Sequence, residues 1–138
     1  MENEPIFLDT SFLVSYFNDN DENHKKSLII MDKIMGDEYG VFHISDYIFD
    51  EYITVLLARI KNLNTVTGYG EDLREGSRIV MVEKTDFDEA WNIFQNQKNT
   101  LFSFTDCVTQ VLMKKYRINF LATFDKEFDK LKEISVVS

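Results

Sequence analysis

Short apolar segments alternate with longer segments of helical periodicity along most of the chain, and this alternation limits the fold more than any other feature. Five segments are apolar enough to be strands, at residues 6–8, 41–44, 79–82, 119–122 and 134–137. Most of them lack polar alternation, so they suit strands covered on both faces. Strands that alternate with helices build parallel sheets. The pattern therefore predicts an α/β fold with a five-stranded, mainly parallel sheet.

The segments between these strands have the spacing of amphipathic helices. We expect helices at residues 11–17, 22–35, 46–61, 86–97 and 105–116, and a short one at 126–132. Residues 62–78 contain several glycines and only scattered apolar residues, so their structure stays open from sequence alone. No linker, repeat or low-complexity segment divides the chain, which predicts one domain over residues 1–138.

The composition restricts the functions that this chain can have. It carries 24 acidic against 15 basic residues, a formal net charge of −9. This balance disfavours a protein that binds nucleic acid through a broad basic surface. One cysteine and two histidines are too few for an internal disulfide or a Cys/His zinc site. The chain starts without a signal-peptide pattern, and no apolar run could span a bilayer, so we expect a cytoplasmic protein without membrane contact.

Acidic residues stand at or near the ends of the predicted strands. Asp9 directly follows the first strand, and Asp125 stands shortly after the fourth. Asp106 opens a predicted helix, and Glu51 lies early in the helix after the second strand, beside its apolar face. In an open parallel sheet the ligand site lies at the carboxyl ends of the strands, where the strand order reverses. We therefore expect these four carboxylates to converge in one half-buried crevice.

Four carboxylates in one crevice repel one another unless a cation compensates their charge. Oxygen ligands without histidine or thiolate suit a hard divalent ion, so we expect Mg²⁺ or Mn²⁺. Such ions favour phosphate substrates and activate water for attack on phosphorus. The residue types themselves thus indicate hydrolysis of a phosphate ester.

Simpler roles stay open for each of these acids. Asp9 has the position of a cap for the first helix, and residues 103–106 have the S-x-x-D form of a capping box. Asp125 could begin the short helix that follows it, and Glu51 could lie on the surface. Each of these roles is common by itself, whereas all four together are less so.

Four sequence blocks resemble the motifs of PIN-domain proteins, most of all the VapC-type toxin ribonucleases of prokaryotic toxin–antitoxin pairs. The first block is a hydrophobic strand that runs into Asp-Thr-Ser, at residues 6–13. The second combines Ser45 with an acid and a Leu-rich run that ends in Arg, at residues 51–59. The third and fourth lie at residues 101–107 and 121–128. All four occur in the family's order over nearly the whole length.

The resemblance implies a three-layer α/β/α sandwich and a Mg²⁺- or Mn²⁺-dependent endoribonuclease. Its catalytic metal ligands would be Asp9, Glu51, Asp106 and Asp125. The hydroxyls that would support these carboxylates by hydrogen bonding are Ser11, Ser103, Thr10 and Thr123. The chain departs mildly from the family at Glu127, where Asp or His is frequent, and this leaves the fourth ligand intact.

The resemblance also implies partners. VapC-type toxins usually form homodimers and are silenced by an antitoxin whose peptide lies across the active-site groove. We therefore expect an RNA substrate, a cognate antitoxin and a homodimer. Two alternatives stay open: a PIN nuclease of RNA maturation or turnover without a toxin role, and a catalytically inactive interaction module. A phospho-accepting receiver domain fits less well, because Asp9 stands alone where that fold needs paired acids.

Other polar residues have plainer interpretations. Arg59 falls near the middle of the apolar arc of its helix, so we expect it to be half-buried and paired with an acid, with RNA contact as the functional alternative. Cys107 and His43 are expected in the core or at its edge rather than in catalysis. The basic residues at 114–117 suit the C-terminal end of a helix, where they compensate its dipole.

Overall fold

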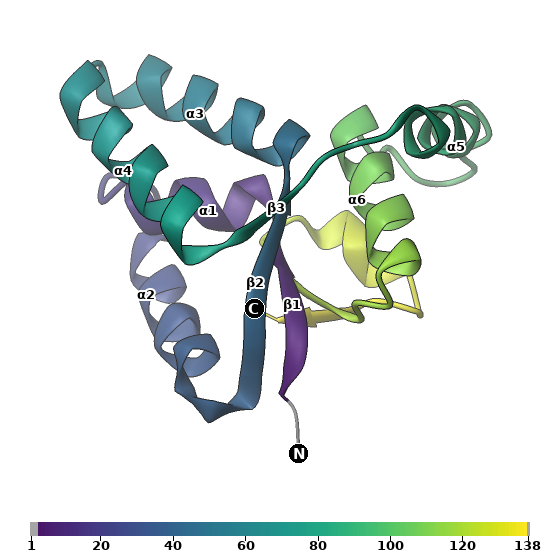
Figure 1. Cartoon of the computed structure of the whole chain (residues 1–138), viewed down its shortest axis with the longest axis horizontal. Coiled ribbons are helices and arrows are strands. Elements are labelled where there is room, and N and C mark those ends of the chain that lie inside the picture. Colours follow the sequence, from purple (N-terminus) through teal and green to yellow (C-terminus); the bar gives the residue numbers. More distant parts are fainter. Residues whose placement is uncertain (1–2, 138) are drawn as a thin grey trace.

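The strands form one five-stranded sheet in the order β3-β2-β1-β4-β5, and every pairing is parallel. A computed structural model describes residues 3–137 of the chain (Figure 1). The strands are β1 (Glu4–Leu8), β2 (Tyr39–Ser45), β3 (Arg78–Val80), β4 (Phe120–Ala122) and β5 (Ser135–Val137). All five predicted strands are confirmed. Residues 1, 2 and 138 of the predicted single domain lie outside the described residues.

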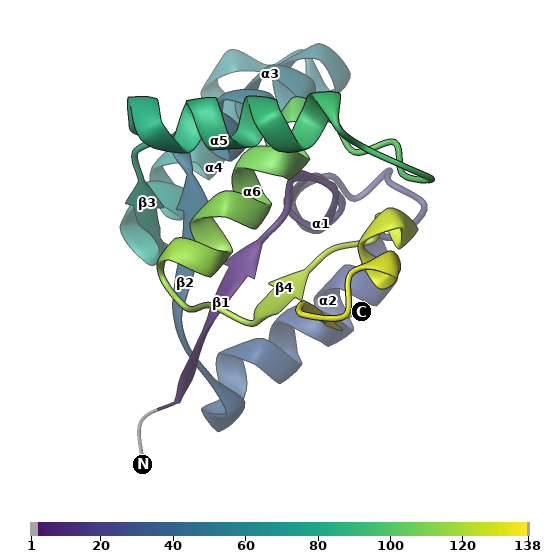
Figure 2. The same ribbon diagram turned by 90° about the vertical axis from the view of Figure 1, so that its right-hand side faces the viewer.

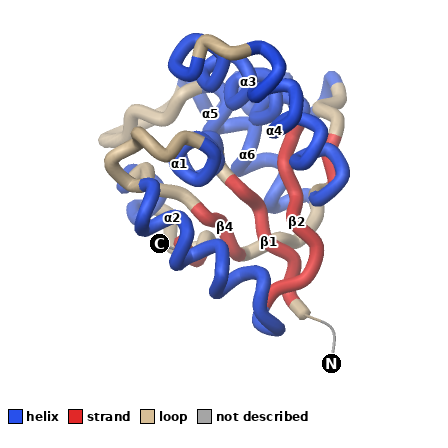
Figure 3. The backbone as a smooth tube through the Cα atoms, turned by 90° about the vertical axis from the view of Figure 1, so that its left-hand side faces the viewer, coloured by secondary structure: helices blue, strands red, loops and turns tan. Residues whose placement is uncertain are grey.

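Helices cover both faces of this sheet, which confirms the predicted three-layer sandwich. They are α1 (Thr10–Phe17), α2 (His24–Lys33), α3 (Asp46–Ile60), α4 (Leu63–Gly76), α5 (Lys84–Gln95) and α6 (Phe104–Lys115). Figure 1 shows α1, α2 and α4 on one side of the strands and α5 and α6 on the other, and α3 packs against α1 and α4. From one side, α6 lies beside β1 with α5 above it (Figure 2), and from the other side α2 lies in front of the strands (Figure 3).

The central strand β1 positions the carboxyl-end edge of the sheet. Its apolar residues Ile6, Phe7 and Leu8 are fully or almost fully buried, as expected of a strand covered on both faces. The strand order runs outward from β1 in both directions, so it reverses between β1 and β4. The Asp9 amide donates a hydrogen bond to the Ala122 carbonyl at 3.0 Å, which carries this pairing one residue beyond β1. A ligand crevice is therefore expected beside Asp9.

Residues 62–78, whose structure the sequence leaves open, fold mainly as α4. The Asn62 side chain caps this helix by accepting a hydrogen bond from the Thr65 amide at 3.1 Å. Gly70 lies where α4 meets α3, and a Cβ atom there would come 2.9 Å from Cδ1 of Ile53. A glycine that weakens the helical pattern in the sequence thus allows the two helices to approach closely.

The predicted helix boundaries lie within two residues of the observed ones. The main local departure follows α2, where the chain continues through a π-type turn, η1 (Ile34–Glu38). Gly36 has a non-helical ψ of −168° there, and this breaks the helix so that the chain can enter β2. The predicted short helix at 126–132 is the 3₁₀ segment η2 (Lys126–Lys130). No helix within residues 3–137 is long and apolar enough to cross a membrane.

Candidate active site

A crevice of about 380 Å³ opens at the carboxyl-end edge of the sheet. Its wall includes all four acids expected there and three of the four hydroxyl residues expected to support them, namely Asp9, Glu51, Asp106, Asp125, Thr10, Ser11 and Ser103. These side chains come from the turn after β1, from α1, α3 and α6, and from the turn after β4. Segments far apart in the sequence thus meet at the point where the strand order reverses.

Asp9 is the most buried of the four acids, with 4% of its surface exposed. Its Oδ2 accepts hydrogen bonds from the Thr123 hydroxyl at 2.7 Å and from the Ser11 hydroxyl at 3.2 Å. Although Asp9 occupies the N-cap position of α1, its side chain makes no capping hydrogen bond. The simple cap interpretation of Asp9 is therefore wrong, because its carboxylate faces the crevice and the β4 turn instead.

The two hydroxyls beside Asp9 also organise the turn after β4. Ser11 Oγ accepts a hydrogen bond from the Phe124 amide at 3.0 Å, and Thr123 Oγ1 accepts one from the Asp125 amide at 3.0 Å. These contacts join the segments that follow β1 and β4. Thr10 differs, because its buried hydroxyl has no hydrogen-bond partner within the described residues, and its side chain supports no carboxylate.

Asp106 and Asp125 are placed by local hydrogen bonds. Ser103 and Asp106 form the predicted capping box of α6, with the Ser103 amide 3.0 Å from Asp106 Oδ2 and the Asp106 amide 3.1 Å from Ser103 Oγ. Asp125 begins η2 by accepting a hydrogen bond from the Glu127 amide at 3.0 Å. Both acids therefore have a structural role, and both still line the crevice. Glu51 is half-buried, and its side chain has no hydrogen bond or ion pair with another described side chain.

The acids raise one another's proton affinity. Burial raises the pKa of Asp9 to about 7, and the charge of Asp106 adds to the rise. Burial likewise raises the pKa of Asp106 to about 6, and the charges of Asp125 and Glu51 contribute. The crevice therefore holds negative charge that no cationic side chain fully compensates, which is the condition that a bound cation relieves.

The oxygen donors of the crevice suit a hydrated divalent cation. Among the side chains that the structure describes, no three from His, Cys, Asp or Glu are arranged to enclose an ion by themselves. Mg²⁺ does not need such a cage, because it usually keeps several waters and binds through one or two carboxylates. The uncompensated carboxylates of Asp9 and Asp106 are suitable ligands of this kind.

Arg59 departs from its predicted burial. Its side chain is 54% exposed, because the last turn of α3 runs away from the strands (Figure 1). The predicted pairing with an acid is confirmed, since Nη1 lies 3.3 Å from Oδ2 of Asp21, and both residues line the crevice. Asp21 is not among the site residues predicted from the sequence. The turn-forming residues at 18–21 predict a loop there, but they do not show what that loop contacts.

Residues that the sequence analysis assigned to the core lie there. Cys107 is fully buried, and burial with the charge of Asp106 raises the pKa of its thiol to about 11, which leaves it unreactive at neutral pH. His43 is buried in β2, where Nδ1 lies 3.0 Å from the Val41 carbonyl oxygen. Of the basic cluster, Lys115 pairs with the buried Asp86 at 3.2 Å. None of these groups takes part in the crevice.

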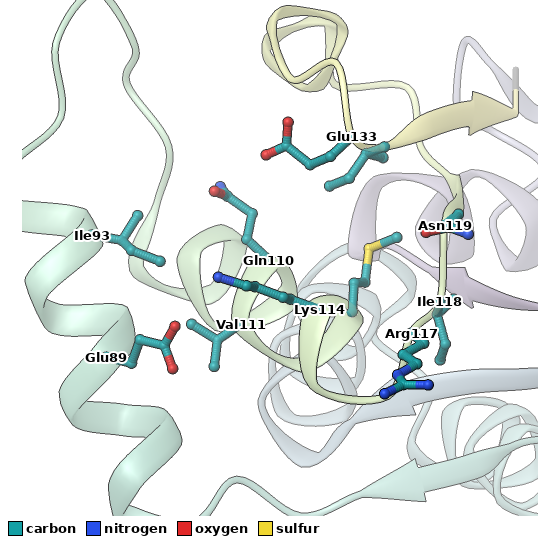
Figure 4. Close-up of a pocket in the computed structure, with 11 residues that line it drawn as sticks. Glu89, Ile93, Gln110, Val111, Lys114, Arg117, Ile118, Asn119 and Glu133 are labelled. Atoms are coloured by element: carbon teal, nitrogen blue, oxygen red, sulfur yellow. The ribbon is translucent and has the colours of Figure 1, made fainter.

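A larger cavity, about 530 Å³, lies between α5, α6 and the segment before β5. Figure 4 shows Ile93 and Glu89 of α5 facing Val111 and the Lys114 side chain of α6, with Glu133 beyond Gln110. None of the four crevice acids lines this cavity. We refer to it below as the α5–α6 pocket.

Comparisons with known proteins agree with this geometry. The family model described as the PIN domain matches residues 6–134. The chain is 26% identical over 152 residues to Ribonuclease VapC6 of Methanocaldococcus jannaschii, with 96% of this chain and 95% of the relative covered.

Two solved structures have a similar fold. The crystal structure of the Mycobacterium tuberculosis toxin VapC20, described as cleaving the sarcin-ricin loop, matches with a TM-score of 0.82 at 21% identity, over 92% of this chain and 95% of that one. VapBC2 of Rickettsia felis, bound to a DNA fragment from its promoter, matches with a TM-score of 0.67 at 13% identity, over 96% of each chain. At such identities the likeness is one of fold.

Proposed function

Because this chain belongs to the PIN-domain family, we propose that it is a metal-dependent endoribonuclease that hydrolyses RNA phosphodiesters and leaves 5′-phosphate and 3′-hydroxyl ends. The observation that carries the proposal is the convergence of four carboxylates where the strand order reverses. The raised pKa values of Asp9 and Asp106 support it, because perturbed acids in a crevice are typical of functional sites.

In this proposal the chain holds one or two Mg²⁺ or Mn²⁺ ions through Asp9, Glu51, Asp106 and Asp125. When bound, the cation supplies an activated water and neutralises the charge that develops on the phosphate. Hydrogen bonds from Thr123 and Ser11 keep the Asp9 carboxylate in one orientation. The side chain therefore does not have to change its conformation to bind a cation. Ser103 does the same for Asp106 through the capping box.

We further propose that the protein is a toxin of the VapC kind that acts in the cytoplasm. The names of its relatives support this, since they include a ribonuclease and a toxin that cleaves the sarcin-ricin loop. A toxin–antitoxin complex from Klebsiella pneumoniae has a similar fold, with a TM-score of 0.66 at 13% identity. A cognate antitoxin and a homodimer are therefore part of the proposal.

The test is cleavage of total cellular RNA and a tRNA pool by purified protein, with Mg²⁺ or Mn²⁺ and with EDTA. We expect discrete, metal-dependent cuts that the Asp9→Asn variant does not make. Asp88→Asn is the matched control, because this exposed acid of α5 pairs with Lys84 and lies outside the crevice. Cuts without growth arrest on expression would favour RNA maturation or turnover over a toxin. Absence of cutting after denaturation and refolding, which removes any bound inhibitor, would favour the inactive module.

A further inference from the structure

The acid crevice contains a single cationic side chain within the described residues, and it is Arg59. The acids that line the same crevice are Asp9, Asp21, Glu22, Glu51, Asp106 and Asp125. A polyanionic substrate therefore meets strong negative charge except where a bound cation or this guanidinium faces it. An arginine in such a place is suited to phosphate, because it presents five donors in a rigid planar fork.

Arg59 shares one face of α3 with Glu51. The two residues are eight positions apart, and Val55 lies midway between them, so all three point to the crevice side of the helix. At a rise of about 1.5 Å per residue, Arg59 lies about 12 Å along the helix axis from Glu51. This separation sets Arg59 beside the proposed catalytic acids rather than among them, so its guanidinium is available to a substrate phosphate other than the scissile one.

Asp21 holds this guanidinium from the side that faces the protein. Only 15% of the Asp21 side chain is exposed, whereas 54% of the Arg59 side chain is. The other oxygen of Asp21, Oδ1, accepts a hydrogen bond from the Asn23 amide at 2.9 Å and lies 2.9 Å from the Ser15 hydroxyl. Asp21 is therefore fixed on the protein side and uses its Oδ2 for Arg59.

The same support reaches the proposed metal ligand Asp9. Ser15 stands one turn after Ser11 in α1, and its hydroxyl lies 2.9 Å from the Ser11 carbonyl oxygen. Ser11 in turn donates to the Asp9 carboxylate. One face of α1 thus positions both an acid of the crevice and the anchor of its arginine.

We propose that Asp21 is a positioning residue that holds Arg59 over the crevice as a clamp for the RNA phosphate flanking the scissile bond. This inference rests on the proposed ribonuclease function. One contact to Asp21 leaves other N–H donors of the guanidinium available for the phosphate. A side chain that is already held also loses less conformational entropy when the substrate binds.

The variants Arg59→Ala, Arg59→Lys and Asp21→Asn test the clamp with a short single-stranded RNA that the wild-type chain cleaves. Arg59→Ala should raise KM about tenfold and change kcat little, because a flanking phosphate is bound equally in the ground and transition states. The salt dependence of log(kcat/KM) should become shallower by about 0.7 for one lost phosphate contact to single-stranded RNA. Arg59→Lys should restore this salt slope and part of KM, since it keeps the charge.

Asp21→Asn should raise KM by less than Arg59→Ala, and it should have no further effect in the Arg59→Ala background. That non-additivity is expected only if Asp21 acts through Arg59. Arg74→Ala is the matched control, because Arg74 is 59% exposed, pairs with Glu71 at 2.9 Å and lies in α4 outside the crevice.

Several results would overturn the clamp. If Arg59→Ala lowers the melting temperature but leaves KM and the salt slope at the Arg74→Ala values, the ion pair only ties the 18–23 loop to α3. If Asp21→Asn and Arg59→Ala add fully, Asp21 acts independently of Arg59. If the wild-type chain cleaves RNA and the Arg59→Ala variant has the same KM and salt slope, the clamp is rejected while the ribonuclease function stands. If the wild-type chain does not cleave RNA, unchanged binding of a labelled RNA oligonucleotide by Arg59→Ala still rejects the clamp.

Discussion

The acid crevice and the α5–α6 pocket differ in how their polar side chains are positioned, and this difference marks the crevice as the functional site. The pocket is the larger of the two, at about 530 Å³ against about 380 Å³. Its floor is mostly apolar, and no described ion pair or side-chain hydrogen bond involves the charged side chains of Glu89, Lys114, Arg117 or Glu133 around it. The crevice, in contrast, has carboxylates oriented by hydroxyls and backbone amides. Converging, positioned polar groups indicate chemistry more reliably than size.

The polar groups buried in the two regions also differ in kind. In the crevice, burial and like charges raise the pKa values of two carboxyls. In the pocket, the Gln110 amide has a buried Nε2 with no partner in the described chain, so its polar group is a local cost to stability.

Asp9→Asn should have the largest effect on activity, a loss of more than about a hundredfold in metal-dependent RNA cleavage, because it removes a ligand charge at nearly constant volume. Glu133→Gln, the same kind of change at the α5–α6 pocket, should leave cleavage within about twofold of wild type. The measurement is kcat/KM on one RNA substrate. Equal activity in all three proteins would contradict the assignment of the crevice as the active site.

Thr123→Val should lower kcat/KM about 10- to 100-fold, because Asp9 loses its shortest hydrogen bond while the side-chain volume is kept. Thr109→Val is the control, since Thr109 is equally buried and its hydroxyl contacts only the Thr105 carbonyl within the described chain. Both variants should lose some stability, and only Thr123→Val should lose activity. A loss of activity in both would mean that stability rather than carboxylate orientation is measured.

The free energy of unfolding of the metal-free protein should fall by about 3 kcal/mol as the pH rises from about 4 to 7. The pKa of Asp9 is raised from 3.8 to about 7 by burial and by Asp106, so over this range the folded state binds more protons than the unfolded state. Asp9→Asn should flatten the dependence, and saturating Mg²⁺ should reverse it. Urea unfolding at several pH values measures this, and a slope identical in both proteins would exclude Asp9 as its source.

Gln110→Leu should have the smallest effect, a gain of up to about 1 kcal/mol in the free energy of unfolding with unchanged RNA cleavage. It removes the unpartnered Nε2 and adds apolar contact to the floor of the α5–α6 pocket. Thermal unfolding and kcat/KM check the two parts. Lost activity in a fully stable variant would show that this pocket serves the reaction.

Much of the fold was predictable because it follows from local burial patterns. The five strands and the helices that flank them have distinct apolar periodicities, and their boundaries agree within two residues. The segment at 62–78 was not predictable, because Gly70 looks like a helix breaker until Ile53 of α3 is packed against it. The exposure of Arg59 was missed for a similar reason, since the periodicity of α3 does not tell where that helix leaves the sheet.

The sequence by itself determined the alternation of strands and helices, and it placed acids at or near strand ends, because both are properties of neighbouring residues. The tertiary structure alone decided which hydroxyl holds Asp9 and which acid holds Arg59. Thr123 is 114 residues from Asp9, and Asp21 is 38 residues from Arg59. Such contacts depend on strand order and on the paths of loops, which arise from the packing of the whole chain and leave no periodic trace in the sequence.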